Sequence, residues 1–228
     1  MKKYLFLAVV ILAITLMSSL LLPMWLSSRA EMYLSNLGAS NVHAEVDAAP
    51  SLRLLLGQAD TLKAEAKDIV LGKLVLSDAA VDGENVQFDA IEAYTNRNFK
   101  IISADRLVLT GQITADTLSK FLAREYDKLE NIQVEMHPDG IYVTAEARLL
   151  KSPIRIYIEG ELLEETENIY LHLRRIDIKN ASFGRAAIAG FFDDIPLVQL
   201  KTLPLRAEVR KIEQAEGYVK VVIDCKNE

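Results

Sequence analysis

The side chains that most often carry out chemistry are few and widely separated in this 228-residue chain. His43, His137 and His172 fall on separate predicted strands or turns, without the spacing that brings imidazoles onto one metal ion. Cys225 is the only cysteine, which excludes an intramolecular disulfide and a cysteine-rich zinc site. We interpret it as a half-buried residue of the last strand. No H-E-x-x-H, G-x-S-x-G or phosphate-binding glycine loop is present. The sequence therefore predicts no catalytic residue, no metal site and no cofactor.

One acidic segment is superficially similar to a calcium-binding loop. Asp78, Asp82 and Gly83 have suitable spacing, but Ala80 occupies the expected third ligand position and Asp89 replaces the final glutamate. We therefore predict a turn at Asp82 and Gly83.

The adjacent pair Arg174 and Arg175 could bind a phosphate, because guanidinium groups match phosphate oxygens in a bidentate geometry. Apolar residues precede the pair at odd positions (Leu171, Leu173) and follow it at even positions (Ile176, Ile178). A change of parity within one strand predicts a β-bulge, which could turn one guanidinium toward the mouth of a cavity. The alternative is a solvated pair on an outer face.

An amphipathic helix followed by strands must position these groups. Thr114 is a suitable helix cap, and apolar residues then recur at spacings of three or four. These residues are Leu118, Phe121, Leu122, Tyr126 and Leu129. Residues 132–136 and 141–147 alternate around a Pro138-Asp139-Gly140 turn and predict a hairpin, and two further strands follow. Residues 186–192 are a second short helix candidate, and residues 196–205 an extended segment.

We infer an α+β fold in which a long, curved antiparallel sheet wraps around one or two amphipathic helices. Such a sheet can close a filled core or leave an apolar tunnel. The candidate lining residues are Leu118, Phe121, Leu122, Ile141, Val143, Ile156, Ile158, Leu171, Leu173, Phe191 and Phe192. Ordinary core packing is the alternative for the same side chains.

The N-terminal half predicts several short strands and one apolar turn. Residues 42–46, 62–66, 74–76, 79–81 and 86–88 are the strand candidates. Residues 52–56 are too few to span a membrane, so we predict a buried helical turn; the alternative is an apolar lip that touches the bilayer.

The first thirty residues predict a membrane element. Residues 4–28 carry no charge and would extend roughly 37 Å as a helix, enough for a hydrocarbon core of about 30 Å. Lys2 and Lys3 favour a cytoplasmic N-terminus, which places the rest of the chain outside the cytoplasmic membrane. A cleaved signal peptide is the alternative, but its apolar run is usually shorter. We expect an anchor at residues 1–30 and one domain at residues 31–228, with the helix continuing for about two turns up to Gly38.

The charge of the domain excludes one class of partner. Lys2, Lys3 and Arg29 are the only charged residues among the first thirty, so residues 31–228 hold 23 bases and 32 acids. Nucleic acid is therefore excluded as a partner, and contact with lipid must be apolar or confined to a local patch.

Several segments resemble the LmeA-like phospholipid-binding family. They are residues 50–57 followed by Ala59 and Asp60, the strand with Ala64, Ala66 and Asp68, the helix start at 114–118, and residues 196–205. The resemblance covers most of residues 41–224. It implies a curved antiparallel sheet around helices, similar to the lipid-binding (TULIP-type) fold of bactericidal permeability-increasing protein, with an apolar cavity for phospholipid in the cell envelope. The resemblance assigns no head-group contact to a residue of this chain, so Arg174 and Arg175 are candidate head-group contacts on the strength of their own chemistry.

We therefore expect a membrane-anchored, non-enzymatic envelope domain that binds phospholipid or a related lipid and carries it or presents it to an envelope protein. The alternative is a scaffold or interaction module with a filled core. An envelope hydrolase with unconventional residues is the third hypothesis.

Overall fold

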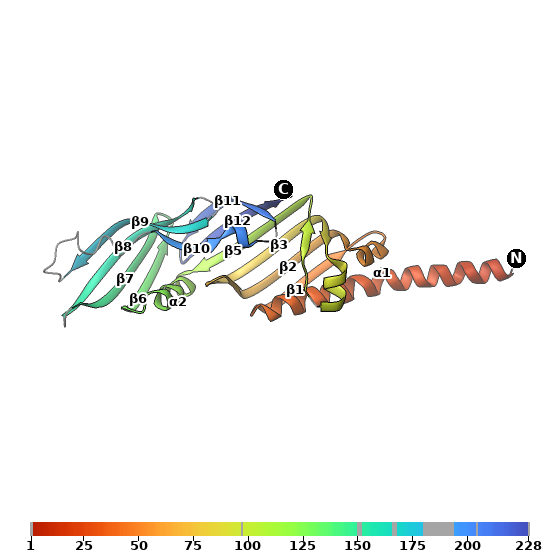
Figure 1. Cartoon of the computed structure of the whole chain (residues 1–228), viewed down its shortest axis with the longest axis horizontal. Coiled ribbons are helices and arrows are strands. Elements are labelled where there is room, and N and C mark those ends of the chain that lie inside the picture. Colours follow the sequence, from red (N-terminus) through yellow and green to blue (C-terminus); the bar gives the residue numbers. More distant parts are fainter. Residues whose placement is uncertain are drawn as a thin grey trace.

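The computed structural model describes residues 2–96, 98–149, 152–165, 168–179, 194–203 and 205–227, with side chains from residue 19 except at 148–149 and 152–153. A long N-terminal helix leads into two antiparallel sheets that lie side by side along the molecule (Figure 1). The chain was expected to form one curved sheet. It forms two sheets. The last two strands of the chain return to the first sheet, where β12 (Tyr218–Lys226) pairs with β5 (Arg106–Thr114).

The large sheet has the strand order β1-β2-β3-β5-β12-β11, and β4 pairs with β3. Its strands are β1 (Ser40–Asp47), β2 (Gln58–Leu71), β3 (Leu74–Phe88), β4 (Ile101–Ser103), β5 (Arg106–Thr114), β11 (Arg206–Ala215) and β12 (Tyr218–Lys226). The short helical turns η1 (Ser51–Leu56) and η2 (Glu92–Asn96) connect strands of this sheet. The sheet curls, and its concave face holds much of the apolar core.

The small sheet has the order β10-β9-β8-β7-β6. Its strands are β6 (Leu129–His137), β7 (Gly140–Leu149), β8 (Ser152–Glu165), β9 (Asn168–Lys179) and β10 (Ile195–Gln199), and β10 leads into the turn η3 (Leu200–Thr202). The predicted hairpin and the two strands after it are confirmed. The apolar positions of β7 and β8 face one another in register, as Val143 does with Ile158, because strict alternation fixes which face is buried.

The predicted bulge in β9 is confirmed. Glu159 pairs with Arg175 and Gly160 pairs with Leu173, which leaves Arg174 as the extra residue. A Cβ atom on Gly160 would lie 2.6 Å from the carbonyl oxygen of His172, so the backbones approach here more closely than a side chain permits.

Helix α2 (Ala115–Glu125) packs between the sheets and is shorter than predicted. The Thr114 hydroxyl accepts a hydrogen bond from the backbone N–H of Thr117, so the predicted cap is confirmed. The apolar spacing continues to Tyr126 and Leu129, but Tyr126 leaves the helical conformation and Leu129 pairs with Ala147 in the small sheet. Sheet pairing therefore ends the helix before its apolar pattern ends.

The predicted turn at Asp82 and Gly83 is wrong. Both residues lie within β3, where Asp82 pairs with Lys63 and Gly83 pairs with Leu62. A Cβ atom on Gly83 would lie 2.7 Å from the Val86 side chain. The glycine therefore serves close packing inside a 15-residue strand rather than chain reversal.

Helix α1 (Lys2–Asn36) is one element that crosses the predicted boundary between residues 30 and 31. Its predicted end at Gly38 is confirmed, with a left-handed φ of 90° at that glycine. Leu26 and Ala30 are buried against the domain. The backbone N–H groups of Ala44 and Val46 on the edge strand β1 donate to Glu31 and Ser27 of α1.

Among the side chains that the structure describes, no helix has both the length and the apolar content needed to cross a membrane. Our predicted span at residues 4–28 lies mostly outside those side chains. The predicted helix at 186–192, with Phe191 and Phe192, lies outside the described residues.

Candidate functional site

The main apolar cavity lies on the concave face of the large sheet and has a volume of about 380 Å³. This volume is near the lower end of the range of about 300–1,000 Å³ for small-molecule sites. Strands β2, β3, β5 and β12 form its floor. Most of its lining side chains are apolar, so hydrocarbon is the ligand chemistry that fits it.

The floor is hollow because small residues share one row of the sheet. Ala79 pairs with Gly111, which pairs in turn with Val221, and all three line the cavity. Neighbouring positions across paired strands point to the same face, so this row lacks side-chain volume on the two adjacent strands β3 and β5.

Two separate parts of the chain wall the cavity. On one side, Tyr33 and Leu34 come from the last turns of α1. On the other side, Ile169 of β9, Val198 of β10 and Leu203 after η3 bring the small sheet to the cavity. Tertiary packing of the first and last parts of the domain therefore creates the cavity.

Residues 98–101 form a third wall with both polar and apolar groups. Phe99 stacks on Phe88 with ring centroids 4.9 Å apart, and Ile101 begins β4. Lys100 is exposed and also lines the cavity. An apolar interior with one cationic side chain at its border suits an amphiphile with an anionic head.

A second, more polar cavity of about 400 Å³ adjoins the first, and the two share Leu71, Val198 and Thr202. Phe121 of α2 lines this second cavity, beside Lys73 and Glu125, which form an ion pair. Phe121 is thus a predicted lining residue that borders the second cavity rather than the apolar one.

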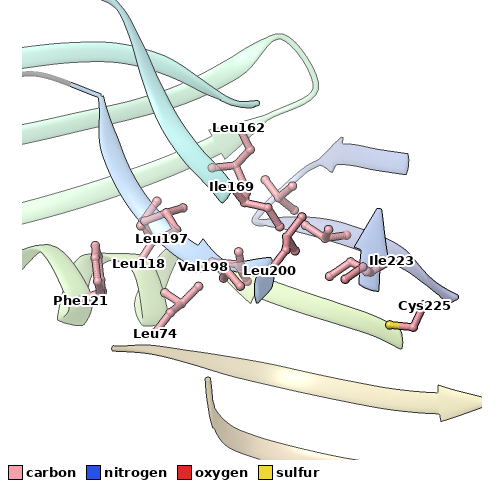
Figure 2. Packing of buried hydrophobic residues seen from close by; sticks show 14 of the residues in the cluster. Leu74, Leu118, Phe121, Leu162, Ile169, Leu197, Val198, Leu200, Ile223 and Cys225 are labelled. Carbon is pink, nitrogen blue, oxygen red and sulfur yellow. The ribbon is translucent and has the colours of Figure 1, made fainter. Parts of the chain in front are cut away.

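The other described lining residues that we predicted lie on α2 and on the small sheet. Buried there are Leu118, Leu122, Ile141, Val143, Ile156, Ile158 and Leu171, and Leu173 is partly buried. Figure 2 shows Leu118 and Phe121 on α2 close to Leu74 and Leu197. The structure brings these residues together in one packed cluster, and none of them is among the described residues that line the apolar cavity. Their predicted role in lipid binding stays a prediction.

Arg174 and Arg175 are exposed on the small sheet and have protein partners. The Arg174 guanidinium donates to the Asp139 carbonyl at 2.9 Å and to the Glu161 carboxylate at 3.1 Å. Arg175 forms an ion pair with Asp177 at 2.7 Å. Neither is among the described residues around the apolar cavity. Their role as head-group contacts is likewise a prediction.

The titratable groups singled out in the sequence do not assemble a reactive centre. Burial raises the pKa of the Cys225 thiol to about 11, which disfavours the reactive thiolate. His137 pairs with Glu216, and His172 pairs with Asp194, each at 3.0 Å. Within the described residues, no group of His, Cys, Asp or Glu side chains could hold a metal ion.

Sequence reasoning missed the residues that build the cavity, above all Ala79 and Gly111 on the floor and Tyr33 and Phe99 on the walls. The available signal was a set of small residues at inward positions of long strands. This signal can be recognised only when the strand pairing is known.

A family model described as LmeA-like phospholipid-binding matches residues 21–223. The chain belongs to this family. The match begins inside α1 and ends in β12, so it includes the helix that walls the cavity as well as both sheets. Searches of the curated proteins and of the solved structures give no match.

Proposed function

We propose that this protein binds phospholipid in the cell envelope and holds an acyl chain in the apolar cavity of the large sheet. The observation that supports this best is a hydrocarbon-lined cavity of about 380 Å³ in a chain of the LmeA-like phospholipid-binding family. No catalytic step is part of the proposal. The protein carries lipid or presents it to another envelope component.

The cavity competes with the bilayer for the same apolar chain. Burying each CH₂ group contributes about 0.8 kcal/mol relative to water, and a membrane offers the same gain. Moving a CH₂ group from the membrane to the cavity therefore changes the free energy very little. Contacts at the head group decide how often the cavity is occupied by lipid. Lys100 at the cavity border is the nearest candidate for such a contact.

Membrane anchoring through α1 is the second part of the proposal. Its support is the uncharged run at residues 4–28, which is helical, together with Lys2 and Lys3 before it. A tethered binding domain works at a high effective concentration of membrane lipid and needs only modest affinity. Membrane fractionation with analysis of the N-terminus tests this part: an intact N-terminus in the membrane fraction supports it, and a soluble chain that lacks residues 1–30 contradicts it.

The test of lipid binding fills the cavity from its floor. In Ala79→Phe, a ring occupies space that an acyl chain needs. Displacing about four CH₂ groups at about 0.8 kcal/mol each lowers affinity roughly 200-fold. The matched control is Asp78→Phe, which adds the same ring at the neighbouring exposed position of β3. The full chain is purified in detergent, and bound phospholipid is quantified by native mass spectrometry after the detergent is removed in the gas phase.

Loss of bound phospholipid in Ala79→Phe with retention in Asp78→Phe supports the proposal. Equal lipid binding by both folded variants contradicts the location of the site. No retained lipid in the unmodified protein favours the interaction module with a filled core.

A further inference from the structure

The turn η1 exposes three leucines close together at the surface of the domain. Leu54 is fully buried, whereas Leu52, Leu55 and Leu56 are 45%, 47% and 74% exposed. The buried helical turn predicted from the sequence is thus present with one side chain inside and three outside. Exposing three leucines in one six-residue turn is unfavourable in water.

A fourth exposed apolar residue comes from the start of the neighbouring turn. Ile91, just before η2, is 73% exposed. In the same turn, Tyr94 donates a hydrogen bond from its hydroxyl to the Leu54 carbonyl at 2.8 Å. The two turns are therefore tied together. We refer to Leu52, Leu55, Leu56 and Ile91 as the apolar collar.

The collar is fixed to α1 where this helix leaves the domain. Trp25 of α1 stacks on Tyr94 with ring centroids 5.2 Å apart, and the Ser51 hydroxyl donates to the Ser19 carbonyl of α1. In Figure 1, the turns after β1 and after β3 lie close to α1 at the end of the domain from which its N-terminal half projects. At this level α1 itself exposes Leu20, Leu21 and Met24.

We propose that the apolar collar is a membrane-docking surface that seats the domain on the bilayer into which α1 inserts. The occupant is a lipid surface because the collar continues the apolar surface of α1 outward from the helix. Length agrees: a helical run of about 37 Å exceeds a hydrocarbon core of about 30 Å, so its last turns, beside the collar, reach the head-group boundary. This inference rests on the proposed anchoring and goes beyond it, since an anchor alone would let the domain stand away from the membrane.

Charge supports apolar docking over electrostatic docking. Residues 31–228 hold 32 acidic and 23 basic residues, so anionic lipid repels the domain as a whole. The one cation of η1, Arg53, forms an ion pair with Asp60. Burial of the collar leucines in the bilayer supplies the favourable free energy of docking that charge attraction does not.

Docking in this orientation brings the cavity close to lipid. Residues 98–101, which form the third cavity wall, follow η2 by one residue, and the Lys100 carbonyl accepts a hydrogen bond from the backbone N–H of Asp89. The collar and the cavity wall are therefore parts of one local structure. A docked collar places that wall beside the head groups.

The experiment places a fluorophore in the collar. Trp25 is the only tryptophan, so a Trp25→Phe background allows one reporter to be introduced at a time. Leu56→Trp reports on the collar, and Leu163→Trp, at a 42% exposed position of β8, is the matched control. The full-length variants are reconstituted in phosphatidylcholine vesicles with and without bromine on the acyl chains. We expect several-fold stronger quenching by brominated lipid at position 56 than at position 163.

Equal quenching at the two positions would overturn the docking proposal. Circular dichroism verifies folding, and Ile91→Trp makes the same comparison if Leu56→Trp does not fold. The quenching experiment tests docking independently of phospholipid binding in the cavity. Position-specific quenching in a chain that binds no phospholipid would refute the proposed function alone, and equal quenching in a chain that binds it would refute docking alone.

Discussion

The two sheets of this protein use the same antiparallel pairing for different purposes. In the small sheet, bulky β-branched and aliphatic residues of β7 and β8 are buried in the hydrophobic core and pair with one another in register. In the large sheet, Ala79 and Gly111 pair on adjacent strands and lie on the floor of a cavity. The small sheet is filled and the large sheet borders a cavity, so a substitution of the same type should cost more stability in the small sheet than in the large one.

Removing volume should produce the largest difference. Leu118→Ala removes a fully buried side chain from the packed cluster and should lower the free energy of unfolding by about 2–5 kcal/mol. Leu76→Ala removes a partly buried side chain that already borders the cavity, so we expect a loss of about 1 kcal/mol. Urea unfolding of both variants in matched detergent gives the two values. Equal losses would mean that the two regions are packed alike.

Adding volume should also be tolerated better in the large sheet than in the small one. Ala145→Val places two methyl groups in the filled region of β7 and should destabilise the protein by about 1–3 kcal/mol through overpacking. Ala79→Val adds the same groups over the cavity floor and should change stability by less than about 1 kcal/mol. Thermal unfolding of lipid-free protein compares the two variants. A clear loss in Ala79→Val would show that the floor has no spare room.

The smallest expected effect concerns the edge of the small sheet, where His172 of β9 pairs with Asp194 before β10. The hydrogen bond with Asp194 raises the pKa of His172, and the same bond lowers the pKa of Asp194. Because the folded-state pKa of the histidine is the higher one, its stabilisation is complete below the unfolded pKa of about 6.5 and is lost as pH rises through the folded value. The contribution is small because both side chains are partly exposed.

His172→Gln should therefore flatten the dependence of stability on pH on the alkaline side of about 6.5, which denaturant unfolding at several pH values measures. His137, whose pKa is also raised by its partner Glu216, stays in place as an internal reference. An unchanged profile in His172→Gln would assign the pH dependence to other groups.

The sequence predicted the small sheet better than the large one, for a physical reason. Residues such as Val143 and Ile158 alternate strictly with polar neighbours, so strand, face and register follow from local pattern. In the large sheet, Gly83 interrupts that pattern and Ala79 weakens it, so one long strand was interpreted as short strands joined by a turn. Ala79, which weakens the strand pattern, is also one of the residues that line the cavity.

The cavity also depends on contacts between residues distant in sequence. Gly111 lies opposite Ala79 on one side and Val221 on the other, and Tyr33 of α1 walls the same space. No local spacing encodes such a juxtaposition. The bulge at Arg174, in contrast, was predictable because a parity change within one strand is a local signal.

Helix α1 has a further mechanical consequence. Tyr33 and Leu34 of the cavity wall stand on the same uninterrupted helix as residues 4–28, and no linker separates them. For a chain inserted through that run, the domain cannot tumble independently of its anchor. The three-dimensional rotational search of a free carrier is thereby reduced to lateral diffusion in the plane of the membrane, with the mouth of the binding chamber held at one angle to every lipid it meets.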